Sequence, residues 1–99
     1  MTYRKYKVVI SDDALGMLDA HIEFVSRVSK SAARRLVDAI LNDMESLSEM
    51  PERCPHYENS FVPPDVYRKL LSNKRYLIIF EITSEAVFVD YIVDTRSDV

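Results

Sequence analysis

Hydrophobic and polar positions follow two rhythms in the first half of the chain. A β-branched run at 6–10 predicts a short strand. Apolar residues then recur every three or four positions over 12–28, and again up to Pro51, which predicts two amphipathic helices in a hairpin. The two predicted stripes are Ala14, Leu15, Leu18, Ile22 and Val25, then Leu36, Val37, Ile40, Leu41, Met44 and Leu47. Gly16 lies inside the first helix, where we interpret it as a point of close packing.

The second half of the chain changes to a β pattern after a proline-rich segment. Residues 51–64 contain all four prolines without periodicity, which is typical of a functional or mobile loop. Residues 66–71 then predict a strand, 72–75 a turn in which Asn73 tolerates positive φ, and 86–93 a last strand. Residues 76–82 are almost uniformly apolar, so this strand should be central and buried on both faces, with Ile78 and Phe80 deep in the core.

The order of these elements, β-α-α-β-β-β, predicts a single α+β domain over 1–99. Its parts are an N-terminal strand, a two-helix hairpin on one face, and a three-stranded antiparallel segment that completes one sheet. The first strand should join this sheet at an edge or beside the last strand.

Single residue counts exclude several classes of function. One glycine cannot form the glycine-rich loops that bind nucleotide phosphates. One cysteine allows no internal disulfide, and with two distant histidines it has no metal-site spacing, so we expect neither metal nor cofactor. No apolar run is long enough to span a membrane or to form a signal peptide, so we expect a cytoplasmic protein.

Charge adds one local feature. The net charge of -3 argues against a general nucleic-acid coat. Basic residues nevertheless gather on the last strands, where they are suited to hold a phosphate or carboxylate, although a solvated hairpin end would also carry them. These residues are Arg68, Lys69, Lys74, Arg75 and Arg96. Cys54 and His56 have no third group to orient them as nucleophile and base, so we assign them structural roles.

Several segments together resemble the RelE/ParE superfamily, the toxins of type II toxin–antitoxin systems, which include plasmid stabilisation proteins. The segments are 67–71, 74–82 and 89–96, preceded by the strand that ends at Ser11, the helix start Ala14-x-x-x-Leu18, and Leu47-x-x-x-Pro51-x-Arg53. The resemblance covers nearly the whole chain and implies the α+β fold described above.

The resemblance also implies how the basic residues act. In the RNA-cleaving members, Lys and Arg on the sheet stabilise the transition state of mRNA cleavage in the ribosome. By resemblance Arg68 and Arg96 are the candidate catalytic residues, with Lys69, Lys74 and Arg75 as candidate target-binding residues. However, the nucleases commonly have Arg after the position of Tyr76, and this chain has Leu77. We therefore favour a ParE-like inhibitor of DNA gyrase over a ribosome-dependent mRNA endonuclease. An inactive or truncated member is a third interpretation.

A toxin of this kind implies a cognate antitoxin in a heteromeric complex, with contact to DNA only through the antitoxin. Met17, Phe24 and Met50 lie off the main helical stripes, where an isolated domain prefers polar residues, so we name them as candidate antitoxin contacts. The alternative is that these three side chains complete the domain's own core.

Overall fold

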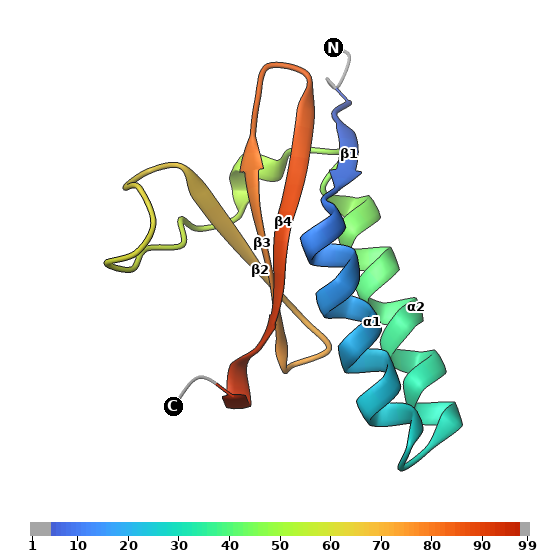
Figure 1. The fold of residues 1–99 in the computed structure, drawn as a ribbon. Coiled ribbons are helices and arrows are strands. Elements are labelled where there is room, and N and C mark those ends of the chain that lie inside the picture. The colour runs from blue at the N-terminus through green and yellow to red at the C-terminus, as the bar shows by residue number, and fades with distance from the viewer. Residues whose placement is uncertain (1–4, 98–99) are drawn as a thin grey trace.

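The computed structural model describes residues 5–97 and contains one four-stranded sheet with two helices (Figure 1). The elements are β1 (Lys7–Ile10), α1 (Asp12–Ser26), α2 (Lys30–Ser46), the 3-10 turn η1 (Pro51–Arg53), β2 (Tyr67–Ser72), β3 (Tyr76–Ile82), β4 (Ala86–Asp94) and the 3-10 turn η2 (Thr95–Ser97). The predicted α+β class and element order are confirmed.

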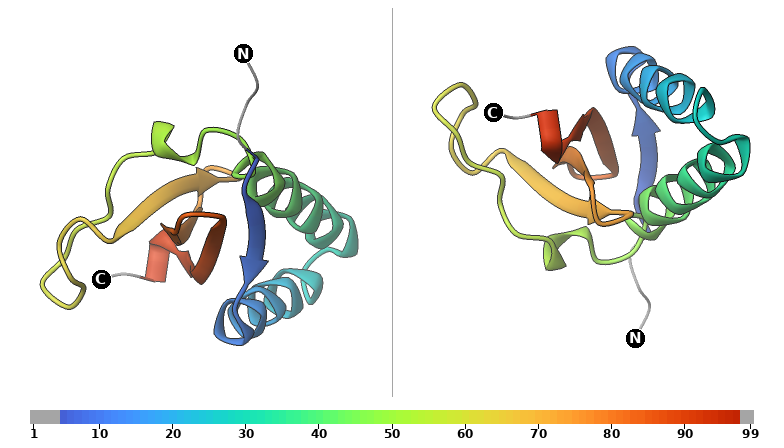
Figure 2. Two further views of the ribbon diagram at one scale, coloured as in Figure 1. Left: turned by 90° about the horizontal axis from the view of Figure 1, so that it is seen from above. Right: turned by 90° about the horizontal axis from the view of Figure 1, so that it is seen from below.

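The strand order is β1-β4-β3-β2. The segment β2–β4 is antiparallel as expected, whereas β1 pairs with β4 in parallel, from Lys7 opposite Ala86 to Ile10 opposite Val89, so the sheet is mixed. Both helices lie along one side of the twisted sheet, and the loop that precedes β2 projects from the other side (Figures 1 and 2). β1 is thus both an edge strand and the neighbour of the last strand.

Serine side chains begin both helices. Ser11 Oγ accepts a hydrogen bond from the Ala14 amide at 3.0 Å, and Ser29 Oγ accepts one from the Ala32 amide at 3.1 Å. These caps satisfy backbone donors that the first turn of a helix leaves unpaired. α1 ends at Ser26, two residues before the predicted end.

The core lies between the helices and the covered face of the sheet. Ile78 and Phe80 of β3 are both 0% exposed, as predicted for a central strand. They belong to a buried cluster with Ala14, Leu18, Leu36, Ile40, Met44, Leu47, Cys54, Tyr76, Val87, Val89 and Ile92. Leu77 and Glu81 on the opposite face of β3 are only partly buried, so the prediction that both faces of this strand are buried is wrong.

Two residues of the predicted apolar stripes, Leu15 and Leu41, lie outside this core. Leu15 is 43% exposed and Leu41 is 46% exposed. Each directly follows a fully buried residue, Ala14 or Ile40, and successive residues lie about 100° apart around a helix. The buried stripe is therefore narrower than the sequence pattern. The interpretation of Gly16 as a packing point is wrong, because a Cβ there would meet nothing within 4 Å.

Two backbone irregularities shape the sheet. Asn73 and Lys74 have φ of 52° and 61°, the two positive values of a type I′ turn between β2 and β3. A register shift after Ile79 leaves Asp90 as an extra residue between Val89 and Tyr91 of β4. Such a bulge increases local twist and changes the direction of side chains.

Candidate functional site

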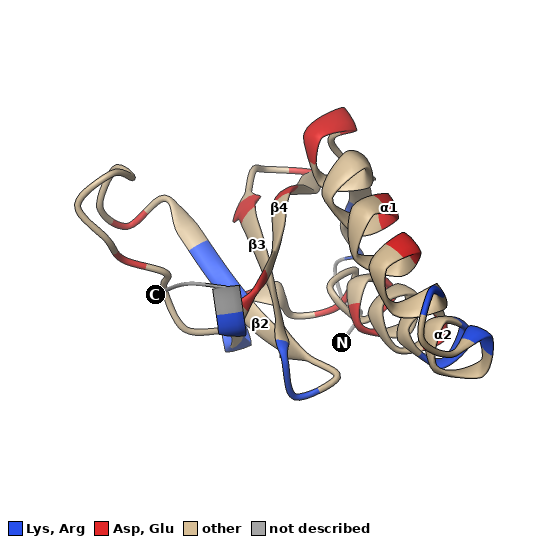
Figure 3. Ribbon diagram, turned by 60° about the horizontal axis from the view of Figure 1, so that its bottom comes forward, with Lys and Arg blue, Asp and Glu red and all other residues tan. Residues whose placement is uncertain are grey.

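The basic residues singled out from the sequence lie on β2, at the β2–β3 turn and on η2 (Figure 3). Acidic residues line α1 in the same view. The structure does not gather the basic residues into one cationic patch. All three arginines instead contact groups of their own chain.

Arg68 fastens the proline-rich segment to the sheet. Its Nη1 donates hydrogen bonds to the carbonyl oxygens of Glu52 at 3.1 Å and Cys54 at 2.6 Å. Its backbone also forms an isolated bridge with His56. One end of the guanidinium group is therefore engaged with backbone, which gives this candidate catalytic residue a structural role.

Arg75 and Arg96 both approach the carboxylate of Asp94. Arg75 Nη2 lies 2.8 Å from Asp94 Oδ2, and its Nε donates to both carboxylate oxygens at 3.1 and 3.2 Å. The Arg75 guanidinium also lies 5.3 Å from the centre of the Tyr76 ring. Arg96 Nε is 3.9 Å from Asp94 Oδ1, and the Arg96 side chain is 63% exposed. Arg75 is thus locked by a two-point ion pair, whereas Arg96 extends into solvent beside it.

These arginines border a hollow of about 640 Å³ between α1 and the end of the sheet. Its other lining residues are Ala20, His21, Phe24, Tyr76 and Asp94. His21 Nε2 donates to the Ile92 carbonyl at 2.8 Å, and its ring lies 5.0 Å from that of Tyr76, so His21 is a packing residue here. Phe24 is 61% exposed. The hollow therefore combines an aromatic wall with a cationic rim.

The two lysines lie apart from this hollow. Lys69 is opposite Ile79, on the face of the sheet away from the helices, and its amide donates to the Pro55 carbonyl at 3.0 Å. Lys74 lies exposed in the type I′ turn. The five basic candidates therefore occupy at least three separate places.

A second hollow, of about 600 Å³, lies between the proline-rich loop and the open face of the sheet. Leu77 and Val93, which are cross-strand partners, contribute apolar surface to it, and Tyr57 and Phe61 line it from the loop. Glu58, Asn59, Asp94 and Thr95 complete its lining. No lysine or arginine is among its lining residues within the described part of the chain.

Two carboxyl groups meet on the same open face. Glu81 is opposite Tyr67 on one side and Phe88 on the other, and the bulge turns Asp90 towards them. A hydrogen bond with Asp90, partial burial and repulsion by the same carboxylate raise the pKa of Glu81 from 4.5 to about 7. Burial, and next the charge of Asp90, raise the pKa of Tyr67 above 10.0. The Tyr67 ring lies 6.1 Å from that of Tyr91.

Sequence reasoning missed this cluster because Glu81 and Asp90 belong to different strands. The bulge that brings them together depends on pairing register and leaves no clear mark in the sequence. From the sequence alone, Tyr67 is only one residue of a predicted strand. The one local signal was a carboxylate inside the apolar run of β3, since a charged residue is uncommon in a central strand.

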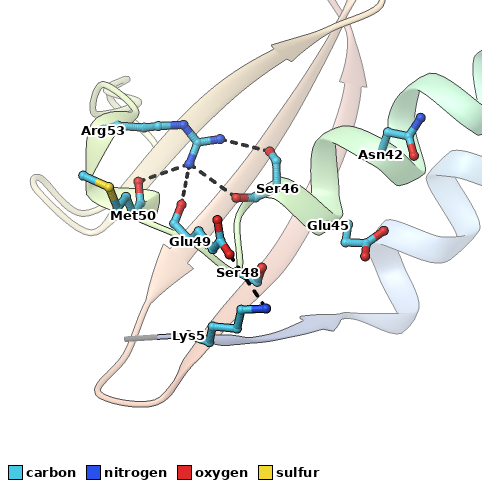
Figure 4. Close-up of a pocket in the computed structure, with 8 residues that line it drawn as sticks. All are labelled: Lys5, Asn42, Glu45, Ser46, Ser48, Glu49, Met50 and Arg53. Atoms are coloured by element: carbon cyan, nitrogen blue, oxygen red, sulfur yellow. Dashed lines mark hydrogen bonds and ion pairs between the residues drawn. The ribbon is translucent and has the colours of Figure 1, made fainter. Parts of the chain in front are cut away.

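The C-terminal end of α2 forms a further hollow, of about 550 Å³ (Figure 4). Arg53 reaches back to this end and donates to the carbonyl oxygens of Ser46, Glu49 and Met50 at 3.4, 2.8 and 3.1 Å, and to Ser46 Oγ at 2.9 Å. A cation that binds the last carbonyls of a helix compensates its negative end. Arg53 is therefore a helix cap, and its position two residues after Pro51 lets it reach the end of α2.

The three candidate antitoxin contacts lie in different surroundings. Met17 packs against the core, Phe24 lines the hollow beside Arg75 and Arg96, and Met50 is 55% exposed next to Arg53. Met50 also has a φ of 49°, in the left-handed region. Met17 and Phe24 share α1, whereas Met50 lies beyond the end of α2, so the structure does not bring all three together.

Residues 5–97 contain no group of three or more His, Cys, Asp or Glu side chains arranged to hold a metal ion. Within the same range, no helix combines the length and the apolar character that crossing a membrane requires. Cys54 is a buried free thiol whose pKa is raised by burial, which makes it a poor nucleophile.

Comparison with known proteins identifies a family and a fold. The model of the family "ParE toxin of type II toxin-antitoxin system, parDE" matches residues 8–99. The solved structure of the "Chromosomal ParDE TA system from P. aeruginosa" is similar in fold, with a TM-score of 0.75 and 16% sequence identity, over 92% of this chain and 97% of that one. No curated protein matches the sequence.

Proposed function

The chain belongs to the ParE toxin family of type II toxin–antitoxin systems, and we propose that it stops growth by binding DNA gyrase rather than by cutting RNA. A gyrase inhibitor needs a surface that fits a protein. An endonuclease instead needs cationic groups placed around the phosphate whose charge grows during cleavage.

The apolar pair Leu77–Val93 carries this proposal. Leu77 occupies the position at which the nucleases commonly have Arg, and here it lines a hollow with Val93, Tyr57 and Phe61. An apolar and aromatic lining suits a protein segment, and the described residues that line this hollow include no cationic donor for a phosphate oxygen. The nearby Arg75 is committed to Asp94 at 2.8 Å.

The charge of the open face supports the same proposal. Two acidic side chains, Glu81 and Asp90, lie on this face of the sheet and share a hydrogen bond. Negative charge at this place repels RNA phosphates. Arg68, the first candidate catalytic residue, is held by two backbone carbonyl oxygens.

Induction of the toxin in growing cells tests the proposal with two readouts. We expect intact messages in primer extension on translating ribosomes and, with purified toxin, inhibition of DNA supercoiling by gyrase. Cleavage within codons would instead establish the endonuclease. A chain that leaves growth, messages and supercoiling unchanged would be an inactive member of the family.

We also propose that a cognate antitoxin covers part of the helical hairpin, in a cytoplasmic heteromeric complex that reaches DNA only through the antitoxin. Phe24 is 61% exposed, which is unusual for a large aromatic side chain and typical of a contact site. Co-expression should therefore give a soluble complex, whereas the free chain should self-associate. Phe24→Asp should weaken antitoxin binding at an unchanged melting temperature. Val28→Asp, at a position 85% exposed, serves as the control.

A further inference from the structure

Phe61 has the highest exposure of the large hydrophobic side chains, at 93%. It lies in the loop 55–66, which projects from the side of the sheet opposite the helices (Figure 1). A phenylalanine that is almost fully exposed in its own domain forgoes most of the hydrophobic stabilisation that burial of its ring would give. That loss is recovered only if a partner covers the ring.

The loop is held in shape although it contains no helix or strand. At its base, the Tyr57 amide donates to the Tyr67 carbonyl at 2.8 Å, and Arg68 binds the carbonyls of Glu52 and Cys54. At its tip, Asn59 Nδ2 donates to the Tyr57 hydroxyl at 2.8 Å, and Asn59 Oδ1 accepts from the Phe61 amide at 2.7 Å. An anchor presented in a fixed conformation loses less entropy on binding than one on a free chain.

The charge of the loop 55–66 indicates which class of partner could bind it. Residues 55–66 contain Glu58 and Asp65 but no lysine or arginine, and both carboxylates are exposed. Insertion of the ring between nucleic-acid bases would need basic groups for the flanking phosphates, which the loop lacks. An anionic lipid surface would repel the loop for the same reason. A protein pocket with an apolar interior and basic groups at its rim is complementary to it.

We propose that Phe61 is the anchor by which the toxin inserts into an apolar pocket of its target protein, with Glu58 and Asp65 facing basic groups at the pocket rim. This inference rests on the proposed function, because it assumes that the target is a protein. The antitoxin is assigned to the helices on the opposite side. Phe61 and the hollow lined by Leu77 and Val93 then form one continuous binding surface.

Phe61→Ala tests the proposal, with Val28→Ala as a matched exposed apolar control. Three properties are measured: inhibition of cell growth, affinity for the antitoxin, and melting temperature. We expect Phe61→Ala to reduce growth inhibition about tenfold or more while antitoxin affinity and melting temperature stay unchanged, since buried aromatic anchors dominate protein interfaces. Val28→Ala should retain full growth inhibition.

Undiminished growth inhibition by Phe61→Ala would overturn the proposal. A parallel loss of antitoxin affinity would also overturn it and assign the loop to the antitoxin. The growth readout does not depend on which protein is the target. If the wild type failed to inhibit gyrase, the gyrase proposal would be refuted. The proposal that Phe61 is the anchor would still be decided by growth inhibition.

The acidic part of the proposal has its own test. The double variant Glu58→Gln/Asp65→Asn removes both charges, and Asn suits position 65, where φ is 64°. The affinity of the wild type for purified gyrase should fall with added salt. The affinity of the double variant for gyrase should depend on salt much less. Equal salt dependence of the two proteins would refute the role of the carboxylates.

Discussion

The two faces of the sheet are built from the same strands but differ in what their side chains contact. On the covered face, Ile78, Phe80 and Val89 are 0% exposed and contact apolar residues of both helices. On the open face, the same strands present Leu77, Glu81 and their neighbours to a loop and to solvent. The comparison suggests that the covered face determines the stability of the fold and that the open face is available for a partner. The predictions below test this difference.

Truncation of the covered face should have the largest effect. Phe80→Ala leaves a cavity at a fully buried site and should lower the free energy of unfolding by about 3–5 kcal/mol in urea titration. The identical substitution at Phe61 should change it by less than about 0.5 kcal/mol. A loss below about 1 kcal/mol at Phe80 would contradict its central position.

Loss of the two hydrogen bonds from the Arg68 side chain should have an intermediate effect on stability. Arg68→Ala removes the donors to the carbonyl oxygens of Glu52 and Cys54, at a cost of about 1–3 kcal/mol in the free energy of unfolding. Lys69→Ala, at the next residue of β2, should cost clearly less. If Arg68→Ala abolished growth inhibition without changing the urea midpoint, Arg68 would belong to the target-binding surface after all.

The carboxyl pair on the open face should make stability depend on pH. The pKa of Glu81 is raised from 4.5 in the unfolded chain to about 7 in the fold, so between these values the folded state holds a proton that the unfolded state has lost. Stability from this group is therefore full below about pH 4.5 and is lost as pH rises through about 7.

Glu81→Gln should remove this part of the pH dependence and raise the melting temperature at pH 8 relative to wild type. Thermal melts at pH 5 and pH 8 measure it, with Glu85→Gln in the exposed β3–β4 turn as the control. Equal slopes for the wild type and Glu81→Gln would mean that Glu81 and Asp90 do not share a proton.

The smallest effect should be a gain in stability. Gly16→Ala places a methyl group in open space and removes the helix cost of glycine, so it should raise the free energy of unfolding by about 0.5–1 kcal/mol. Ala20→Gly on the same helix should lower it by a similar amount. A destabilised Gly16→Ala protein would show that the helix backbone there disfavours a side chain.

The helices and the antiparallel strands were predictable because their signals are local. Apolar spacing marks α1 and α2, and the apolar run at 76–82 marks the central strand β3, although its open face is only partly buried. The parallel pairing of β1 with β4 was not predictable, since partners distant in sequence leave no periodic trace. Asn73 was predictable in its turn because its side chain tolerates positive φ.

The candidate site was predictable only as a set of residues. The sequence identifies Arg68 and Arg75 as basic, but their partners, two carbonyl oxygens and Asp94, depend on how separate segments pack. Glu81 and Asp90 meet because of a bulge, and Phe61 stands out only once its exposure is known. The sequence therefore identifies the chemical type of each candidate residue, but it does not predict which groups that residue contacts.

The pairing of β1 with β4 has a consequence for the synthesis of the toxin. Lys7 and Ala86 are 79 positions apart in the chain, and their strands become neighbours in the sheet. β4 must be synthesised before this contact forms, and contacts between distant residues slow folding. A nascent chain that lacks β4 therefore cannot complete the sheet. An antitoxin already present in the cell could meet the toxin at the moment when it first becomes able to act.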